Sequence, residues 1–272
     1  MRRDLLPGAL AGVMLCCASC GPSRDAGKNA AETKESVYLR GHQLYLTMHM
    51  EEAESELLRA AAMDTTYRDP LVDLGSLTYD LGVKEEGPGR VEHLRKARGF
   101  LARAENLGYR EAAVYDRLCE ICTELEDARG FLKYAKKNAE QYPYDRQYYN
   151  LGVAYFGAED WAGVVKSQRE ASEKFKESQY TGAYYRQMGR AYMKMDRDQT
   201  AERTFSAGLQ AVDAVMAGVK KSGGGAGSEE VRRLQDDKIG MLLLLKRLHT
   251  TYREAEKLAQ VERQLREAGY TK

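Results

Sequence analysis

Apolar and small residues recur along the middle of the chain with helical spacing, and one order of residues is written twice. Between residues 144 and 209, an aromatic residue precedes an apolar residue, a glycine and a second aromatic residue, and small or apolar residues follow. The first copy is Tyr148, Leu151, Gly152 and Tyr155, then Val164 and Ala171; the second is Tyr185, Met188, Gly189 and Tyr192, then Ala201, Phe205 and Gly208. The spacing predicts two helix hairpins, neither of which buries its apolar face alone.

Gly152 and Gly189 fall in the middle of the predicted first helices, where glycine costs about 1 kcal/mol relative to alanine. We therefore expect each glycine to mark the close approach of a neighbouring helix. The pattern resembles the tetratricopeptide repeat (TPR) family, and the resemblance implies an all-α solenoid of stacked helix hairpins. It also implies that a small residue of the second helix, Val164 or Ala201, lies against the glycine.

The TPR resemblance extends to about five hairpins, expected at residues 36–68, 69–110, 111–143, 144–178 and 182–221. Gly41 and Gly75 are one TPR period of 34 residues apart. Ser36 is the expected N-cap of the first helix. Lys84–Arg90 carries most of an insertion, which we expect to form an exposed loop or a lengthened hairpin. The register of the third repeat stays open.

A glycine-rich stretch at 222–228 is expected to form a flexible loop after the fifth hairpin. Residues 229–272 then predict a C-terminal helical pair, either a degenerate sixth repeat or a cap. Met241–Leu245 is strongly apolar but too short to span a membrane. We interpret it as the buried face of this pair, with self-association as the alternative.

The first 19 residues have the features of a bacterial lipoprotein signal peptide. Arg2 and Arg3 precede an apolar run from Leu5 to Cys17, and small residues follow up to Cys20. This arrangement resembles a lipobox, which implies cleavage before Cys20 and lipid attachment to that cysteine. Residues 20–35 would then form a flexible tether. An uncleaved anchor and an ordinary signal peptide are the alternatives.

The balance of charges and the absence of catalytic motifs argue against a nucleic-acid-binding protein and against an enzyme. The chain contains 42 Lys and Arg residues against 41 Asp and Glu residues, and this balance gives no reason to expect a nucleic-acid partner. The sequence contains no nucleophile elbow, phosphate loop or HExxH motif, and its four histidines are dispersed without ligand spacing. We therefore expect no enzyme activity, no cofactor and no metal.

Cys119 and Cys122 form a CxxC pair, a spacing that metal sites and redox sites also use. A structural zinc site needs four ligands, and no second Cys or His pair accompanies these two. Both cysteines occupy positions where the repeat carries small apolar residues, and they lie within a helix rather than at its N-terminus. We interpret them as packing residues. Whether they ever oxidise stays open.

The first helices of TPR hairpins line a concave surface, so the resemblance implies that their polar residues face a partner. The candidates are a basic row of Arg186, Arg190 and Lys194, an acidic row of Asp116, Glu120 and Glu124, and a middle stretch of Arg146, Tyr149, Asn150, Val153 and Phe156. A groove charged oppositely at its two ends would orient an extended peptide. The alternative is that these rows are solvated stripes. Reversing Arg186 and Arg190 to Glu is expected to leave folding unchanged and to weaken partner capture.

The leading hypothesis is a lipid-anchored TPR scaffold that binds a protein or peptide of the bacterial cell envelope. The membrane would be contacted through the N-terminal lipid, and the absence of Asp after Cys20 is compatible with the periplasmic side of the outer membrane. The alternative is a solute- or transporter-associated ligand-binding component, similar to a TRAP-type accessory protein. The 18 tyrosines of the chain would line its pocket. An enzyme ranks last because no catalytic constellation is present.

Overall fold

The computed structural model describes residues 32–221 and 227–270, in which the chain forms twelve α-helices and no β-strand. The predicted signal peptide and Cys20 lie outside the described residues, as do tether residues 20–31 and loop residues 222–226. Within the described part, no helix has the length and apolar character needed to cross a bilayer. The helices are α1 Lys34–Leu46, α2 Met50–Met63, α3 Asp69–Gly82, α4 Gly87–Asn106, α5 Ala112–Glu124, α6 Ala128–Gln141, α7 Asp145–Gly157, α8 Trp161–Lys174, α9 Thr181–Lys194, α10 Asp198–Lys221, α11 Glu229–Thr251 and α12 Ala255–Glu267.

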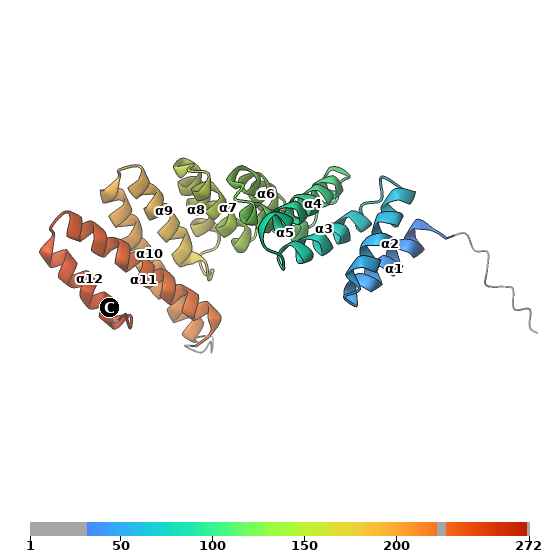
Figure 1. Ribbon diagram of the computed structural model, residues 1–272. Helices are drawn as coiled ribbons and strands as arrows, with labels where there is room; N and C mark the ends of the chain where they lie inside the picture. Colours follow the sequence, from blue (N-terminus) through green and yellow to red (C-terminus); the bar gives the residue numbers. More distant parts are fainter. Residues whose placement is uncertain (1–31, 222–226, 271–272) are drawn as a thin grey trace, which may run out of the picture.

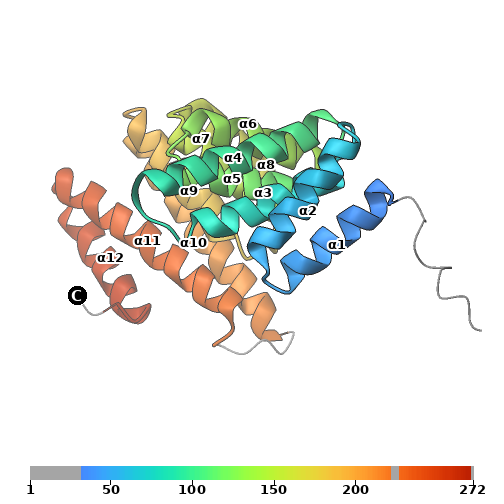
Figure 2. The same cartoon turned by 45° about the vertical axis from the view of Figure 1, so that its right-hand side comes forward.

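Consecutive helices pack in pairs, and the resulting hairpins stack in chain order into an arch (Figures 1 and 2). The prediction of an all-α solenoid of helix hairpins is therefore confirmed. Each hairpin's second helix contacts the first helix of the next hairpin, and most neighbouring first helices also touch. The exception is α5 and α7, which have no Cα atoms within 8 Å of each other. The joint between the third and fourth hairpins consequently rests on α6 and α7.

The glycines within the first helices mark close helix contacts, as expected. A methyl group added to Gly189 would lie 2.1 Å from the Phe205 ring, and one added to Gly152 would lie 2.1 Å from the amide nitrogen of Gln168. The expectation that Val164 and Ala201 lie against these glycines was wrong. The two helices of a hairpin are antiparallel and joined by a short turn. The residue 16 positions after the glycine, Gln168 or Phe205, therefore lies opposite that glycine.

Five of the six described hairpin turns share one backbone conformation, and this gives those repeats a common register. Met48, Glu126, Glu159, Asp196 and Arg253 all have positive φ angles between 54° and 64°. Four of them lie seven residues after Gly41, Cys119, Gly152 and Gly189, respectively. Left-handed conformations are uncommon for residues other than glycine. Their recurrence in five hairpins therefore indicates one turn geometry imposed by the packing of the flanking helices.

The same register can be used to align the C-terminal pair of helices, α11 and α12, with the other hairpins. Counting back from Arg253 puts Lys246 at the position that glycine occupies in other hairpins, and 16 residues later stands Glu262. The Lys246 ammonium lies 2.9 Å from the Glu262 carboxylate, so an ion pair replaces the contact with glycine. Met241 and Leu242 are fully buried, in accord with their interpretation as part of a packed face.

One local prediction was wrong, and the structure decides between the two forms left open for another. Thr33, not Ser36, caps α1: its hydroxyl accepts a hydrogen bond from the Ser36 backbone N–H, and its own backbone is extended as N-caps require. The insertion at Lys84–Arg90 is an exposed loop only in part, because α4 begins at Gly87. The extra residues mostly lengthen the second hairpin, which was the other form expected.

Candidate binding site on the first-helix face

A cavity of about 650 Å³ lies among α7, α9 and α11, the first helices of the last three hairpins. We call the surface formed by α3, α5, α7, α9 and α11 the first-helix face. Each of the three helices contributes polar side chains to the cavity, and one residue comes from the segment before α9. The lining consists of Arg146, Tyr149 and Asn150; Tyr180; Ala183 and Arg186; and Glu229, Arg232, Arg233, Asp236 and Asp237.

Small residues and one ion pair dock α11 on the N-terminal end of α9. A methyl group at Gly182 would lie 2.5 Å from the Asp237 Cβ, so glycine is needed for the helices to approach. The Arg186 guanidinium reaches the Asp237 carboxylate at 3.0 Å and passes over Gly240, where an added methyl would lie 3.0 Å from Nη1. One wall of the cavity is therefore fixed by Arg186 and Asp237.

The Asp237 side chain is only 5% exposed, and its Oδ2 atom has no hydrogen-bond partner. Burial raises the pKa of this carboxyl to about 6, although the nearby Arg186 guanidinium lowers it. Desolvation therefore outweighs the attraction of the arginine. Arg186 is held by this contact and is not a free cation for a ligand, so reversing its charge would also affect folding.

Aromatic rings and further arginines complete the cavity. Tyr149 stacks on Tyr180 with ring centroids 4.9 Å apart, and the Arg233 guanidinium lies 4.9 Å from the Tyr180 ring. Arg146 is 57% exposed, with its nearest acidic oxygen, that of Asp116, at 3.8 Å. Arg232 is exposed and forms no ion pair with the described residues. The cavity thus offers two accessible guanidinium groups beside a flat aromatic surface.

The structure divides the predicted binding residues into separate groups. Arg146, Tyr149, Asn150 and Arg186 meet in the cavity, whereas Phe156, Arg190 and Lys194 lie in a cluster around Trp161. In that cluster Arg190 lies 4.3 Å from the Phe156 ring, Lys194 lies 6.0 Å from the Trp161 ring, and the two rings pack edge to face. Two cations of the basic row, Arg190 and Lys194, therefore already contact aromatic rings of the same chain.

The acidic row is likewise engaged within the protein. Asp116 accepts a hydrogen bond of 2.8 Å from the Asn138 side chain, and Glu120 lies 3.3 Å from Arg117. Glu124 forms an ion pair with Arg90 of the preceding hairpin. Each carboxylate of the acidic row already has a polar or charged neighbour. The geometry therefore favours the cavity over the acidic row as the site where a ligand forms new contacts.

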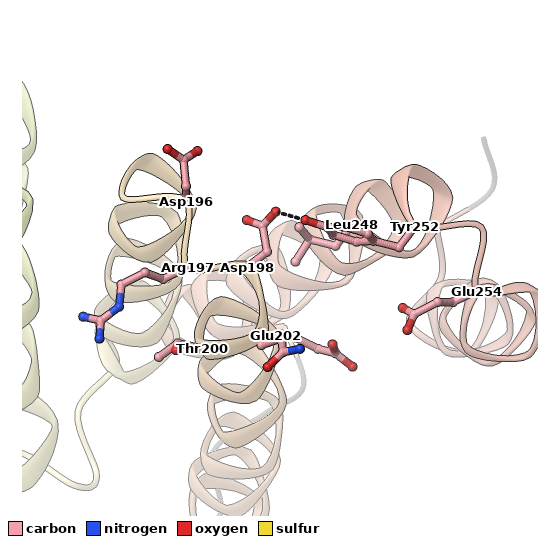
Figure 3. A pocket seen from close by; sticks show the side chains of 9 residues that line it. Asp196, Arg197, Asp198, Thr200, Glu202, Leu248, Tyr252 and Glu254 are labelled. Carbon is pink, nitrogen blue, oxygen red and sulfur yellow. Dashed lines mark hydrogen bonds between the residues drawn. The ribbon is translucent and has the colours of Figure 1, made fainter.

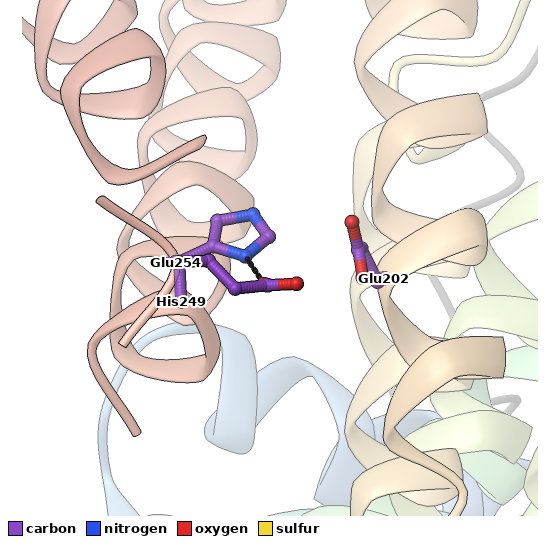
Figure 4. A group of neighbouring side chains, drawn as sticks. All are labelled: Glu202, His249 and Glu254. Carbon is purple, nitrogen blue, oxygen red and sulfur yellow. Dashed lines mark hydrogen bonds and ion pairs between the residues drawn. The ribbon is translucent and has the colours of Figure 1, made fainter. Parts of the chain in front are cut away.

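A second group of titratable residues lies between the last two hairpins, where α10, α11 and α12 meet. Asp196, Asp198, Glu202, Tyr252 and Glu254 are among the residues that line a cavity of about 510 Å³ there, and Asp198 accepts a hydrogen bond from Tyr252 (Figure 3). The fold also brings the buried His249 to Glu202 and Glu254, a proximity that sequence spacing does not reveal (Figure 4).

These three side chains have ligand atoms within 4.8 Å of one another, close enough to hold a metal ion. However, the Lys257 ammonium lies 2.9 Å from both carboxylates, and the His249 ring nitrogen lies 2.7 Å from Glu254. Lys257 already supplies the positive charge that a metal would bring. We therefore interpret the group as an ionic contact that ties α12 to α10.

Cys119 and Cys122 are both buried and unbridged within a cluster that includes Leu118, Ile121 and Tyr134. Burial raises the pKa of both thiols, which suppresses the reactive thiolate. This environment agrees with their interpretation as packing residues.

Tyr180, Arg232, Arg233 and Asp237 were not predicted as site residues. The C-terminal pair was interpreted as packing, with self-association as the alternative, and alternating Arg and Asp residues on a helix usually indicate a solvated surface. The one hint is that glycines stand at positions 182 and 240, on helices that must approach each other closely.

No family model and no curated protein matches this chain. Among solved structures it is similar to YrrB, described as a TPR protein with an unusual peptide-binding site, with 14% identity and a TM-score of 0.51 over 65% of this chain and 84% of that one. It is also similar to the crystal structure of MamA, with 15% identity and a TM-score of 0.51 over 66% and 92% of the two chains. At such identities the similarity shows the fold alone, and that fold is the one of TPR proteins.

Proposed function

From the TPR fold and the cavity among α7, α9 and α11, we propose that this chain is a non-enzymatic scaffold that binds an extended segment of a partner protein. The proposal includes a lipid anchor at Cys20 and a location in the bacterial envelope, on the periplasmic side of the outer membrane. The observation that carries the binding role is the cavity itself, in which accessible arginines border a pair of stacked tyrosines.

The side chains of the cavity favour a particular ligand chemistry. Guanidinium groups bind carboxylates with two parallel hydrogen bonds, and Arg146 and Arg232 are accessible for such a contact. The half-buried Tyr149 ring offers apolar area at low entropic cost, because the side chain has few rotatable bonds and is held by stacking on the buried Tyr180. A peptide carrying an acidic group beside an apolar or aromatic side chain would use both features.

Replacing both Arg146 and Arg232 with Glu is expected to weaken capture of the partner about tenfold to a hundredfold, since each replacement removes a charge-assisted hydrogen bond. Affinity capture of the full chain from its own envelope, followed by mass spectrometry and titration of the recovered partner, measures the effect. Arg95→Glu with Arg129→Glu is the matched control, because both residues are exposed and lie on α4 and α6, outside the cavity. Equal recovery by both double variants would rule out the cavity as the binding site.

Replacing Cys20 with Ser is expected to move the protein from the detergent phase to the aqueous phase in phase partitioning. Lipid attachment requires the cysteine thiol, and no described helix could replace the anchor. The circular dichroism spectrum should stay unchanged, because Cys20 lies outside the helices that the structure describes. Persistence of the Cys20→Ser variant in the detergent phase would contradict lipid anchoring without bearing on the cavity.

A further inference from the structure

A furrow of about 660 Å³ opens on the opposite side of α9, between the second helices α8 and α10. Tyr185, Met188 and Tyr192 of α9 form its floor, while α8 and α10 form its walls. The two walls have no Cα atoms within 8 Å of each other, and between them Tyr185 is half-buried while Met188 and Tyr192 are buried. The floor residues are those that repeat the pattern of Tyr148, Leu151 and Tyr155, which line a smaller furrow of about 450 Å³ between α6 and α8.

The α10 wall is built of small side chains. Thr200, Thr204, Ala207, Ala211 and Ala214 follow one another at helical spacing along the furrow. Small residues allow another helix to approach closely. A second, independent feature is Thr181, which lines the furrow, is only 3% exposed and has an Oγ1 atom without a hydrogen-bond partner. Buried hydroxyl groups normally have a partner, so the hydroxyl of Thr181 is left unsatisfied within the single molecule.

The charge of the furrow is positive. Its walls carry Arg169, Lys176 and Arg203 against the single acidic residue Glu173. Arg169 donates a hydrogen bond to the Tyr192 hydroxyl, whereas Lys176 and Arg203 form no ion pair with the described residues. A complementary occupant would therefore be a helix with exposed apolar side chains and unpaired acidic groups.

The first hairpin carries such a helix. Five of the eight large apolar side chains exposed in the described chain belong to this hairpin, and Leu58 and Met63 of α2 are 44% and 47% exposed. Glu51 and Glu52, in the first turn of α2, form no ion pair with described residues. At 1.5 Å per residue the 14 residues of α2 are about 21 Å long, and the α10 wall from Thr200 to Ala214 also spans about 21 Å.

We propose that α2 of one molecule docks in the α8–α10 furrow of a second copy of this chain. Within one molecule α2 contacts only α1 and α3, and it lies toward the other end of the arch from α10 (Figure 1). The contact therefore joins two different surfaces of two molecules. Such a head-to-tail contact repeats from copy to copy and builds a ring or an open chain of subunits.

The test is sedimentation velocity of the full chain carrying Cys20→Ser, so that an attached lipid does not contribute to association. The unaltered surfaces should give species that grow with concentration. Leu58→Glu on α2 and Ala207→Glu in the furrow should each weaken association about tenfold or more, because each introduces a charge into an apolar contact. Both residues are exposed, so circular dichroism should show intact folding.

Mixing the two variants makes the test specific. The Leu58→Glu molecule keeps its furrow and the Ala207→Glu molecule keeps its α2, so an equimolar mixture should form a dimer and nothing larger. Ala217→Glu, an exposed α10 position that is not among the furrow-lining residues, is the matched control and should associate like the parent. A parent chain that stays monomeric would overturn the proposal. So would dissociation by Leu39→Glu together with normal association of Ala207→Glu, because that result indicates stacking through α1.

Discussion

The variant Gly189→Leu is expected to unfold about 3 kcal/mol more easily than the parent chain. A Cβ atom at this position would lie 2.1 Å from the ring of Phe205, which is fully buried and has no space to move into. Either the ring must leave its rotamer or α9 must separate from α10, and both outcomes lose packing. Thermal and urea denaturation followed by circular dichroism measure the change in the free energy of unfolding.

Gly99 provides the matched control. It lies within α4, is exposed, and has no atom within 4 Å of an added Cβ. Gly99→Leu should stabilise the chain by roughly 0.5 to 1 kcal/mol, because leucine has the higher helix propensity. If Gly189→Leu proved as stable as Gly99→Leu, the close approach of α9 and α10 would be refuted.

The second large effect is expected for Arg186→Leu, which should lower the free energy of unfolding by about 3 kcal/mol at neutral pH. The change leaves the buried Asp237 carboxylate without the guanidinium that lies 3.0 Å away. The double variant Arg186→Leu, Asp237→Asn should recover much of this loss, because no unpaired charge is then buried. An equal loss in the single and double variants would mean that the arginine contributes only by its packing.

The pH dependence of stability tests the same contact. The Asp237 carboxyl has a pKa of about 6 in the folded chain, above the value of about 3.9 expected after unfolding. The folded state therefore binds the proton more tightly, so this group favours folding below pH 4, and its contribution is lost as the pH rises toward 7. Arg186 faces the carboxyl from α9, and Arg233 and Asp236 face it from α11. Over this range the parent should lose about 2 to 3 kcal/mol more stability than Asp237→Asn. Parallel profiles would contradict the raised pKa.

The sequence was sufficient to predict the helix hairpins because glycine and aromatic residues recur with a fixed spacing. It placed the close contacts at Gly152 and Gly189 correctly but chose the wrong partners. Apolar periodicity identifies which face is buried, whereas the vertical match of two antiparallel helices depends on turn length. Positive φ angles at residues such as Glu159 and Asp196 fix that length. A glutamate or aspartate in the sequence does not by itself predict a positive φ angle.

The cavity among α7, α9 and α11 was predicted only on the side formed by α7 and α9. Arg146, Tyr149 and Asn150 follow from the face that the first helices share, but the α11 side depends on how the C-terminal pair docks. Docking is decided by Gly182 and by the pairing of Arg186 with Asp237, residues 51 positions apart in the sequence. Reading helix faces one by one cannot detect a contact of this kind.

Between α5 and α7 the arch lacks the contact that joins the other neighbouring first helices, so this joint is packed on one side only. The hairpins on either side are held together through α6 and α7, and across the gap Arg146 approaches Asp116 only to 3.8 Å. Bending there would change the distance between α2 and the furrow of the same chain while leaving the cavity among α7, α9 and α11 undistorted. Subunits linked through α2 and the furrow would thus form an assembly whose curvature adapts to its surroundings, and every binding cavity along it would keep the same shape.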